Sequence, residues 1–423
     1  MSTSARPHPF ASVNPHALAT ILEASQTKRI IASRDIFDLG GTKLWARDLP
    51  VSQSLQRKLI DRQLRHPLES CLQAEDGVST HTLVRALDAL LAQDSPLSSL
   101  LRPSAEKIVR TAAQLPLHSV AQLLLTAGQA ARPDSFQHAV QAMALAGSLM
   151  AAHGGGPQEM RLAMLGGLLH DLGEMYIAPE FGEAEAEREL DFVSYQQLVV
   201  HPHVGSLLLT QLTDYPAVLA QAVAEHHERL DGSGYPHALQ RAQVSPLGRL
   251  LAVTEATLGA LRGAHSHLAR VSIALRVVPG EFDLHWVGRI AHASRSQPIL
   301  QPTLTAESIQ ARLAQLDAAM RAADSGISEA LRGEQVPALK NGLDLAQHLL
   351  GRLRTGWNAS GLWIHDAVVS QDASEVEAVE QELMFRLRGV ERALRLRAAD
   401  LPPDAAARLE RLCVDCLGST GRH

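Results

Sequence analysis

The chain has 423 residues, of which 46% are hydrophobic and only 4% are aromatic, and its formal net charge is −6. This length predicts two or three domains, with cores of Leu, Ala and Val packed between helices. The slight acidic balance excludes a general polyanion-binding surface, so a nucleic-acid polymer is not expected as a partner.

The sequence has no signal-peptide pattern, and no apolar run approaches the roughly 18 residues of a membrane span. We therefore expect a cytoplasmic protein with no membrane partner. Three Cys fit a reducing compartment better than a disulfide framework. Cys413 and Cys416 have the spacing of redox and zinc motifs. Because no second pair accompanies them, we interpret them as two thiols one helical turn apart.

Residues 1–75 predict a small N-terminal α+β accessory unit. A short helix is expected over residues 15–24, and β-rich runs then lie on either side of Gly40 and Gly41. Two such runs around a Gly-Gly turn are typical of a β-hairpin. Ser52 is a suitable N-cap for a helix that is expected to continue to about Leu64.

Residues 76–132 predict helices that lead into the next domain. Apolar residues recur at helical spacing between residues 80 and 128, and Leu83, Leu87, Leu90 and Leu91 share one face. Pro103 and Pro116 mark the expected boundaries between these helices.

Residues 133–300 carry a spaced set of His residues. Asp134 follows a Pro and precedes a helix with His138, so it is either an N-cap or a residue on the same face as His138. A helix over residues 159–169 leads to His170 and Asp171. A further helix over residues 192–199 is expected to end at Pro202, with His201 at its tip.

Residues 226–236 are the most informative stretch of the chain. His226 and His227 end an apolar, helix-like run, and a Gly-rich turn that closes on Pro236 prevents the helix from continuing. Neighbouring side chains on a helix point about 100° apart, so each His could serve one ion of a metal pair. The alternative is an ordinary helix end with cationic His near the negative end of the dipole.

Imidazole suits transition metals, and a carboxylate such as Asp171 can bridge two ions. The order, spacing and local sequence from about Asp134 to Glu255 resemble the HD-GYP family, the bacterial cyclic-di-GMP phosphodiesterases of the wider HD superfamily. The resemblance implies a mainly α fold with an all-α HD-type helical core. It also implies two divalent transition-metal ions, Fe or Mn, or three ions if Asp134 takes the place of a Glu that some members use.

The resemblance carries the family's site onto named positions. The implied metal ligands are His138, His170, Asp171, His201, His226, His227 and Glu255. The implied catalytic residues are His170 and Asp171, and the implied substrate-binding residues are Glu174, Asp231, Gly232, Gly234, Tyr235, Pro236, Arg262 and Arg270. Glu255 stands where the family has Asp, and its extra methylene shifts the carboxylate by about 1.5 Å.

Two departures concern the substrate. Glu174 stands where the family has a Lys near a substrate phosphate, which converts attraction into repulsion of about 1 kcal/mol or more. The family's basic segment after the last ligand is also replaced, which leaves Arg262 and Arg270 as candidate phosphate contacts. The first hypothesis is hydrolysis of cyclic-di-GMP to pGpG or GMP. The alternatives are a weak or inactive module that binds nucleotide or partner proteins, and another phosphoester substrate on the same site.

Residues 301–423 predict a C-terminal helical region without a metal or phosphate motif. Helices are expected over residues 306–323, 328–354, 374–399 and 403–417. Long helices of this composition usually bury one face on other helices. We therefore expect a bundle for packing, for a homodimer or for contact with a signalling partner.

Overall fold

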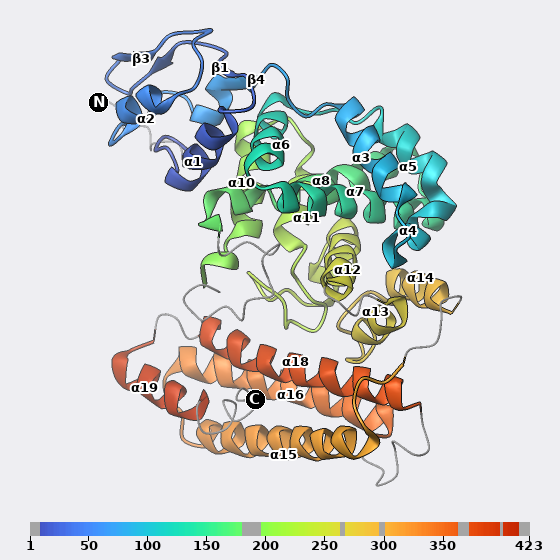
Figure 1. Cartoon of the computed structure of the whole chain (residues 1–423). Coiled ribbons are helices and arrows are strands. Elements are labelled where there is room, and N and C mark those ends of the chain that lie inside the picture. The colour runs from blue at the N-terminus through green and yellow to red at the C-terminus, as the bar shows by residue number, and fades with distance from the viewer. Residues whose placement is uncertain are drawn as a thin grey trace. The chain divides into compact units, whose positions relative to one another are not determined.

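The computed structural model describes residues 9–179, 196–262, 267–295, 301–362, 372–397 and 401–413. It is mainly helical, which confirms the predicted fold class, and the strands among the described residues all lie in the N-terminal region (Figure 1). The chain divides into two compact units, Met1–His226 with Ser245–Thr254, and His227–Val244 with Glu255–His423. None of the described helices is both long and apolar enough to span a bilayer.

The N-terminal part of the first unit is a small α+β module. Helix α1 (Pro15–Ala24) begins at Asn14, whose side chain accepts hydrogen bonds from the first turn. Strands β2 (Ile36–Phe37) and β3 (Lys43–Trp45) form the predicted antiparallel hairpin. Strand β1 (Ile30–Ala32) pairs instead with β4 (Leu72–Ala74), which the sequence analysis missed. A strand of three residues whose partner lies 40 positions away has no local periodicity to reveal it.

Helix α2 (Gln53–Leu59) begins after Ser52 as predicted but ends earlier than Leu64. Ile60 has a ψ of 129° and Asp61 a φ of 56°, so the backbone leaves the helical conformation directly after Leu59. The 3-10 helix η1 (Leu68–Cys71) follows before β4.

The middle of the first unit consists of packed helices. Their bounds are α3 (Thr80–Ala92), α4 (Pro96–Leu101), η2 (Arg102–Ser104), α5 (Ala105–Ala112), α6 (Ser119–Ala131), α7 (Pro133–His153) and α8 (Pro157–Leu169). Leu83, Leu87 and Leu90 are buried, as their spacing predicted, and Leu91 is half-buried. Pro103 and Pro116 lie at helix boundaries as expected. Helices α7 and α8 pack along each other and carry the first two candidate ligands.

The 3-10 helix η3 (Leu172–Tyr176) and helices α10 (His201–Leu212) and α11 (Ala217–Glu225) follow. The expectation that Pro202 ends a helix is wrong, because Pro202 lies in the first turn of α10. A Pro is tolerated there, since the first-turn N–H groups have no intrahelical partner. Residues 192–195 of the expected preceding helix lie outside the described residues.

The second unit begins with the loop 227–244, in which η6 (Arg241–Gln243) is a single 3-10 turn. Helix α12 (Pro246–Leu261) belongs to both units, and α13 (Leu268–Ala274) and α14 (Leu284–Ser294) follow it. In the described part of residues 133–300 no strand occurs.

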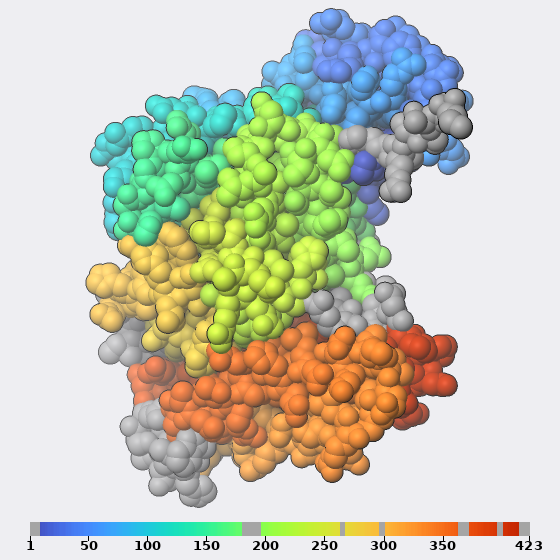
Figure 2. Space-filling model, turned by 180° about the vertical axis from the view of Figure 1, so that it is seen from behind, coloured from blue at the N-terminus to red at the C-terminus, as the bar shows by residue number. Residues whose placement is uncertain are grey.

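The C-terminal helices are α15 (Ala306–Leu331), α16 (Pro337–Ser360), α18 (Ala373–Arg397) and α19 (Pro403–Leu412). They share one hydrophobic core in which α16 packs against α18, and α16 forms a continuous orange surface in the space-filling view (Figure 2). The predicted break after residue 323 is wrong, because buried Ala323 and Ile327 continue the apolar face of α15. The break lies instead before Pro337, the first residue of α16.

Candidate metal centre

The carboxylate of Asp171 lies among four imidazole rings. Its Oδ2 is 3.3 Å from Nε2 of His138 and 3.0 Å from Nε2 of His170. Its Oδ1 is 3.4 Å from Nε2 of His201 and 3.3 Å from Nε2 of His226. Each oxygen therefore faces one pair of His side chains, which is the arrangement of a carboxylate that bridges two ions.

The spacing within each His pair also fits a metal site. The Nε2 atoms of His138 and His170 are 3.2 Å apart, and those of His201 and His226 are 3.1 Å apart. Two nitrogens that each lie about 2.1 Å from one ion, at an angle near 95°, are separated by about 3.1 Å. The donor set of imidazole nitrogens and one shared carboxylate is the set that transition metals prefer.

Three of these rings are oriented by the turn of main chain that precedes them. Nδ1 lies 2.8 Å from the Gly167 carbonyl in His170, 2.6 Å from the Leu198 carbonyl in His201 and 2.6 Å from the Val223 carbonyl in His226. A carbonyl oxygen only accepts, so each Nδ1 carries the proton and donates it. Nε2 is therefore the nitrogen of each ring that faces Asp171, and it can bind an ion once it carries no proton.

Two sets of donor residues could each hold an ion, with the donor atoms of a set within 4.8 Å of one another. The sets are Asp171, His201, His226 and His227, and His138, His170, Asp171 and Glu255. Together they contain every residue that the sequence implied as a ligand except Asp134. Metal binding itself stays a prediction.

Asp134 is not the N-cap of α7, and it belongs to neither of the two donor sets. The N-cap position of α7 is Arg132, Pro133 is the first helical residue, and Asp134 lies exposed in the first turn. There its charge is favourable for the helix dipole. A Pro is preferred as the first helical residue, and this moves the cap one position before it.

The charge of Asp171 is set by opposing influences. Burial would raise the pKa of its carboxyl. The charge of His170 and the hydrogen bonds from His138, His170 and His201 outweigh burial, and they hold the pKa well below its usual range. Asp171 is therefore an anion that can neutralise part of the charge of two cations.

Gly173 sets how closely α10 approaches this centre. A Cβ atom at this position would lie 2.0 Å from the His201 carbonyl oxygen and 2.8 Å from the Gly205 nitrogen. Only a residue without a side chain allows the start of α10, and with it His201, to lie beside the turn that follows Asp171.

The loop 227–244 is built by its own side chains. Asp231 accepts hydrogen bonds at Oδ1 from the backbone nitrogen (3.0 Å) and hydroxyl (2.7 Å) of Ser233. Gly232 has a φ of 85°, and a Cβ at Gly234 would lie 2.4 Å from the Arg229 nitrogen. The Tyr235 ring, expected near a base of the substrate, stacks on the His227 ring at 4.5 Å and 17°. These residues therefore shape the loop, and their contact with substrate stays a prediction.

Glu228 is a residue of this loop that the sequence analysis missed. Its buried carboxylate accepts hydrogen bonds from the backbone nitrogens of His237 (2.7 Å) and Leu239 (2.8 Å). A carboxylate beside a Gly- and Pro-rich turn was the available signal, because such turns leave backbone N–H groups that need acceptors.

Three charged residues that were expected to face the substrate are buried or bonded to other protein side chains. Glu174, expected at a rim, is only 4% exposed and lies in η3, where its backbone carbonyl accepts from Arg132 (2.9 Å). Arg262 donates to Glu255 (3.1 Å), and Arg270 donates to Gln381 (2.7 Å). Both candidate phosphate contacts are thus bonded to side chains of the protein, and their role toward a substrate stays a prediction.

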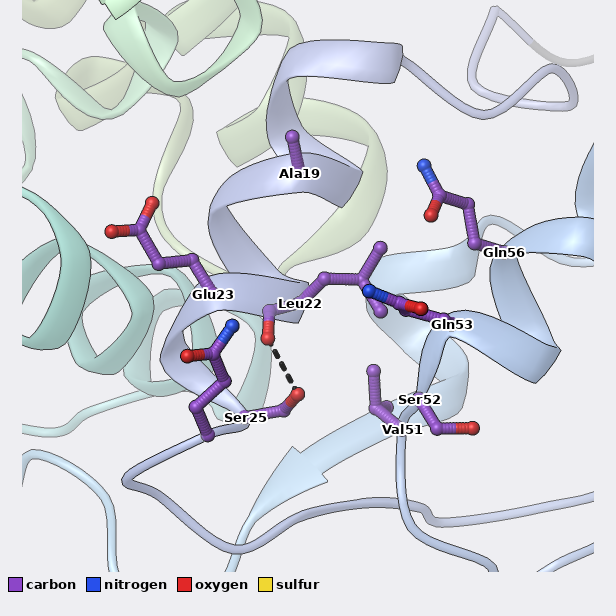
Figure 3. A pocket seen from close by; sticks show the side chains of 9 residues that line it. Ala19, Leu22, Glu23, Ser25, Val51, Ser52, Gln53 and Gln56 are labelled. Carbon is purple, nitrogen blue, oxygen red and sulfur yellow. Dashed lines mark hydrogen bonds between the residues drawn. The ribbon is translucent and has the colours of Figure 1, made fainter.

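A separate pocket lies in the N-terminal module. It has a volume of about 610 Å³ and is lined by residues of α1 and of the segment 51–56 (Figure 3). Ser25 at its edge donates to the Leu22 carbonyl (2.6 Å), which closes the end of α1. The candidate site residues do not line this pocket.

A family model described as an HD domain matches residues 107–276. The chain is 26% identical over 212 residues to the cyclic di-GMP phosphodiesterase PA4108 of Pseudomonas aeruginosa, over 49% of this chain and 48% of that protein. It is 28% identical over 138 residues to the 3'3'-cGAMP-specific phosphodiesterase 1 of Vibrio cholerae, over 32% of this chain and 31% of that protein. No solved structure gives a significant match.

The chain thus spans about half, or less, of the length of these curated relatives. The matched segment contains His138, His170, Asp171, His201 and His226. Residues 107–276 therefore match an HD domain, and this part of the chain is similar to phosphodiesterases that act on cyclic dinucleotides.

Proposed function

We propose that the chain is a metal-dependent phosphodiesterase that hydrolyses cyclic-di-GMP to pGpG or GMP. The observation that carries the proposal is the Asp171 carboxylate, whose two oxygens face two separate pairs of His nitrogens. Relatives named as phosphodiesterases of cyclic di-GMP and 3'3'-cGAMP support a cyclic dinucleotide as the substrate class.

The residues of the two donor sets would hold two ions, Fe or Mn, which supply Lewis acidity that lowers the pKa of water and neutralises phosphate oxygens. Asp171 contributes one oxygen to each set and remains ionised because of its low pKa. The carbonyls behind His170, His201 and His226 keep the protons on Nδ1 and direct Nε2 inward. No nucleophile from the protein is needed for this reaction.

The test is to load the purified protein with Mn²⁺ or Fe²⁺ and to follow cyclic-di-GMP and 3'3'-cGAMP turnover by chromatography. Asp171→Asn and His201→Ala should each lower bound metal and reduce kcat by at least about 100-fold, because they remove ligands directly. His203→Ala is the matched control, since His203 lies exposed on the same helix two residues after His201. An Asp171→Asn protein with full metal content and turnover would contradict the proposal.

A second candidate function is a weak or inactive module that binds nucleotide or protein partners. It is favoured by Glu174 in place of the expected Lys and by the side-chain partners of Arg262 and Arg270. Calorimetry with cyclic-di-GMP on the metal-loaded protein separates the two functions. Binding without turnover supports the module, whereas turnover supports the enzyme.

A further inference from the structure

The loop 227–244 is bonded to a residue that follows the matched HD domain. The backbone nitrogen of Leu230 donates to the Glu281 carbonyl oxygen (2.8 Å). The Arg229 guanidinium is 3.8 Å from Glu281 Oε1 and lies over the Phe282 ring at 4.7 Å from its centroid. Both the backbone and the side chain of Glu281 therefore contact the segment directly after His227.

Glu281 is in turn held by helix α18. The Arg386 Nε atom is 3.0 Å from Oε1 and 3.2 Å from Oε2 of Glu281, and Nη2 donates to the Ala274 carbonyl (3.3 Å). The side chains of Glu281 and Arg386 are 4% and 19% exposed. Burial raises the pKa of the Glu281 carboxyl, while Arg386 and Arg229 act in the opposite direction. A pair this buried loses much more when one partner is removed than an exposed pair does.

Helix α16 provides a second connection to the loop. His348 Nε2 donates to the backbone carbonyl of Asp231 (3.2 Å), one residue before the Gly232–Pro236 turn. That turn carries Tyr235, whose ring stacks on His227. Residues 281, 348 and 386 all lie beyond residue 276, where the match to the HD domain ends.

We propose that Glu281, His348 and Arg386 are positioning residues for the loop that carries His227 and Tyr235, so that residues beyond the matched HD domain hold a candidate metal ligand in place. The part of this inference that concerns catalysis rests on the proposed function. The part that concerns loop order and metal affinity does not.

The test compares Arg386→Gln and His348→Ala with wild type by hydrogen exchange and by metal titration. Amides of residues 230–241 should exchange on the order of tenfold faster, because local opening costs less when their anchors are lost. Metal affinity should fall by about 10- to 100-fold, the usual cost of losing groups that orient ligands. At saturating metal, kcat should return close to the wild-type value while KM stays raised, because the Gly232–Pro236 turn still lacks its anchors.

Arg395→Gln is the matched control, because Arg395 lies on the same helix and pairs with Glu391 (3.0 Å) and Glu410 (2.8 Å). The double variant Glu281→Gln, Arg386→Gln removes both charges of the buried pair together and should recover part of the loop protection. The proposal is overturned if Arg386→Gln lowers the Tm while loop exchange and metal affinity stay at wild-type values. It is also overturned if exchange rises equally in residues 9–75. A wild type without turnover refutes the proposed function and leaves these two readouts intact.

Discussion

His170, His201 and His226 follow three different helical segments but share one hydrogen-bond pattern. In each, Nδ1 donates to the carbonyl three residues earlier, so the ring is oriented by the last turn that precedes it. The sequence placed all three residues at helix ends, where the main chain leaves such carbonyls unpaired. It could not show that each ring bonds to the carbonyl three residues earlier.

The close approach of α10 to Gly173 can be tested by substitution. Gly173→Ala should destabilise the protein by about 3 kcal/mol and lower metal content, because the new methyl would meet the His201 carbonyl and overpacking of this kind is costly. Urea unfolding and metal analysis measure the two effects. Gly128→Ala is the control, since nothing lies within 4 Å of its Cβ position, and it should stabilise α6 by about 0.5–1 kcal/mol. Wild-type stability of Gly173→Ala would show that α10 can move away without loss.

Among the elements, the helices that carry ligands were predicted better than the turns between them. The segments before His170 and His226 are long apolar runs, and they appear as α8 and α11. Pro202 was misread because the same residue can end one helix or begin the next, and only the packing of α10 decides between the two. Glu174 was misplaced because the chain after Asp171 turns as a 3-10 helix, which buries a side chain that was expected at the rim.

The stacking of Tyr235 on His227 in the turn 232–236 can be tested by substitution. Tyr235→Ala should weaken metal affinity about two- to tenfold, because a stacked aromatic pair contributes about 0.5–1.5 kcal/mol. Tyr235→Phe keeps the ring and should retain wild-type affinity. Chelator competition with Mn²⁺ measures both variants. Equal weakening in the two variants would assign the effect to the hydroxyl and not to the stack on His227.

In the whole molecule, the N-terminal module shares its core with the HD domain. Leu123, Ala127 and Met175 pack in the same hydrophobic cluster as residues of β1, α1 and α2. Arg132 joins the Thr20 hydroxyl (3.0 Å) to the Glu174 carbonyl (2.9 Å). The boundaries predicted near residues 75 and 132 stay predictions, as does a homodimer through the C-terminal helices. A core shared between distant segments cannot be read from local periodicity.

The buried pair of Glu69 and Tyr176, in which the phenol donates to the carboxylate, gives a pH-dependent test of this shared core. Burial raises the pKa of Glu69 above its ordinary value of 4.5, and the Tyr176 hydrogen bond acts in the opposite direction. The stability that Glu69 contributes is therefore present below its unfolded pKa and is lost as the pH rises through the raised folded value. Tyr176→Phe should raise that pKa further and cost about 1–3 kcal/mol at pH 7.5.

The loss should be smaller at pH 5, where Glu69 is more often protonated, and thermal unfolding at both pH values measures the difference. Tyr215→Phe is the control, since the Tyr215 hydroxyl donates to the Pro116 carbonyl (2.9 Å) and accepts from the His118 backbone nitrogen (2.8 Å). Neither backbone group titrates, so this variant should lose stability equally at both pH values. A loss from Tyr176→Phe that does not change with pH would contradict the assigned role of Glu69.

The hydrogen bonds behind His170, His201 and His226 also have a consequence for selectivity. Because the rotamers of these rings are fixed during folding, little conformational entropy remains to be lost when a ligand sphere closes. A preorganised set of donors resists adjustment, so an ion whose preferred bond lengths or angles differ gains less from it. Discrimination among ions would then come from the rigidity of the helix ends and not only from the chemical type of the donor atoms.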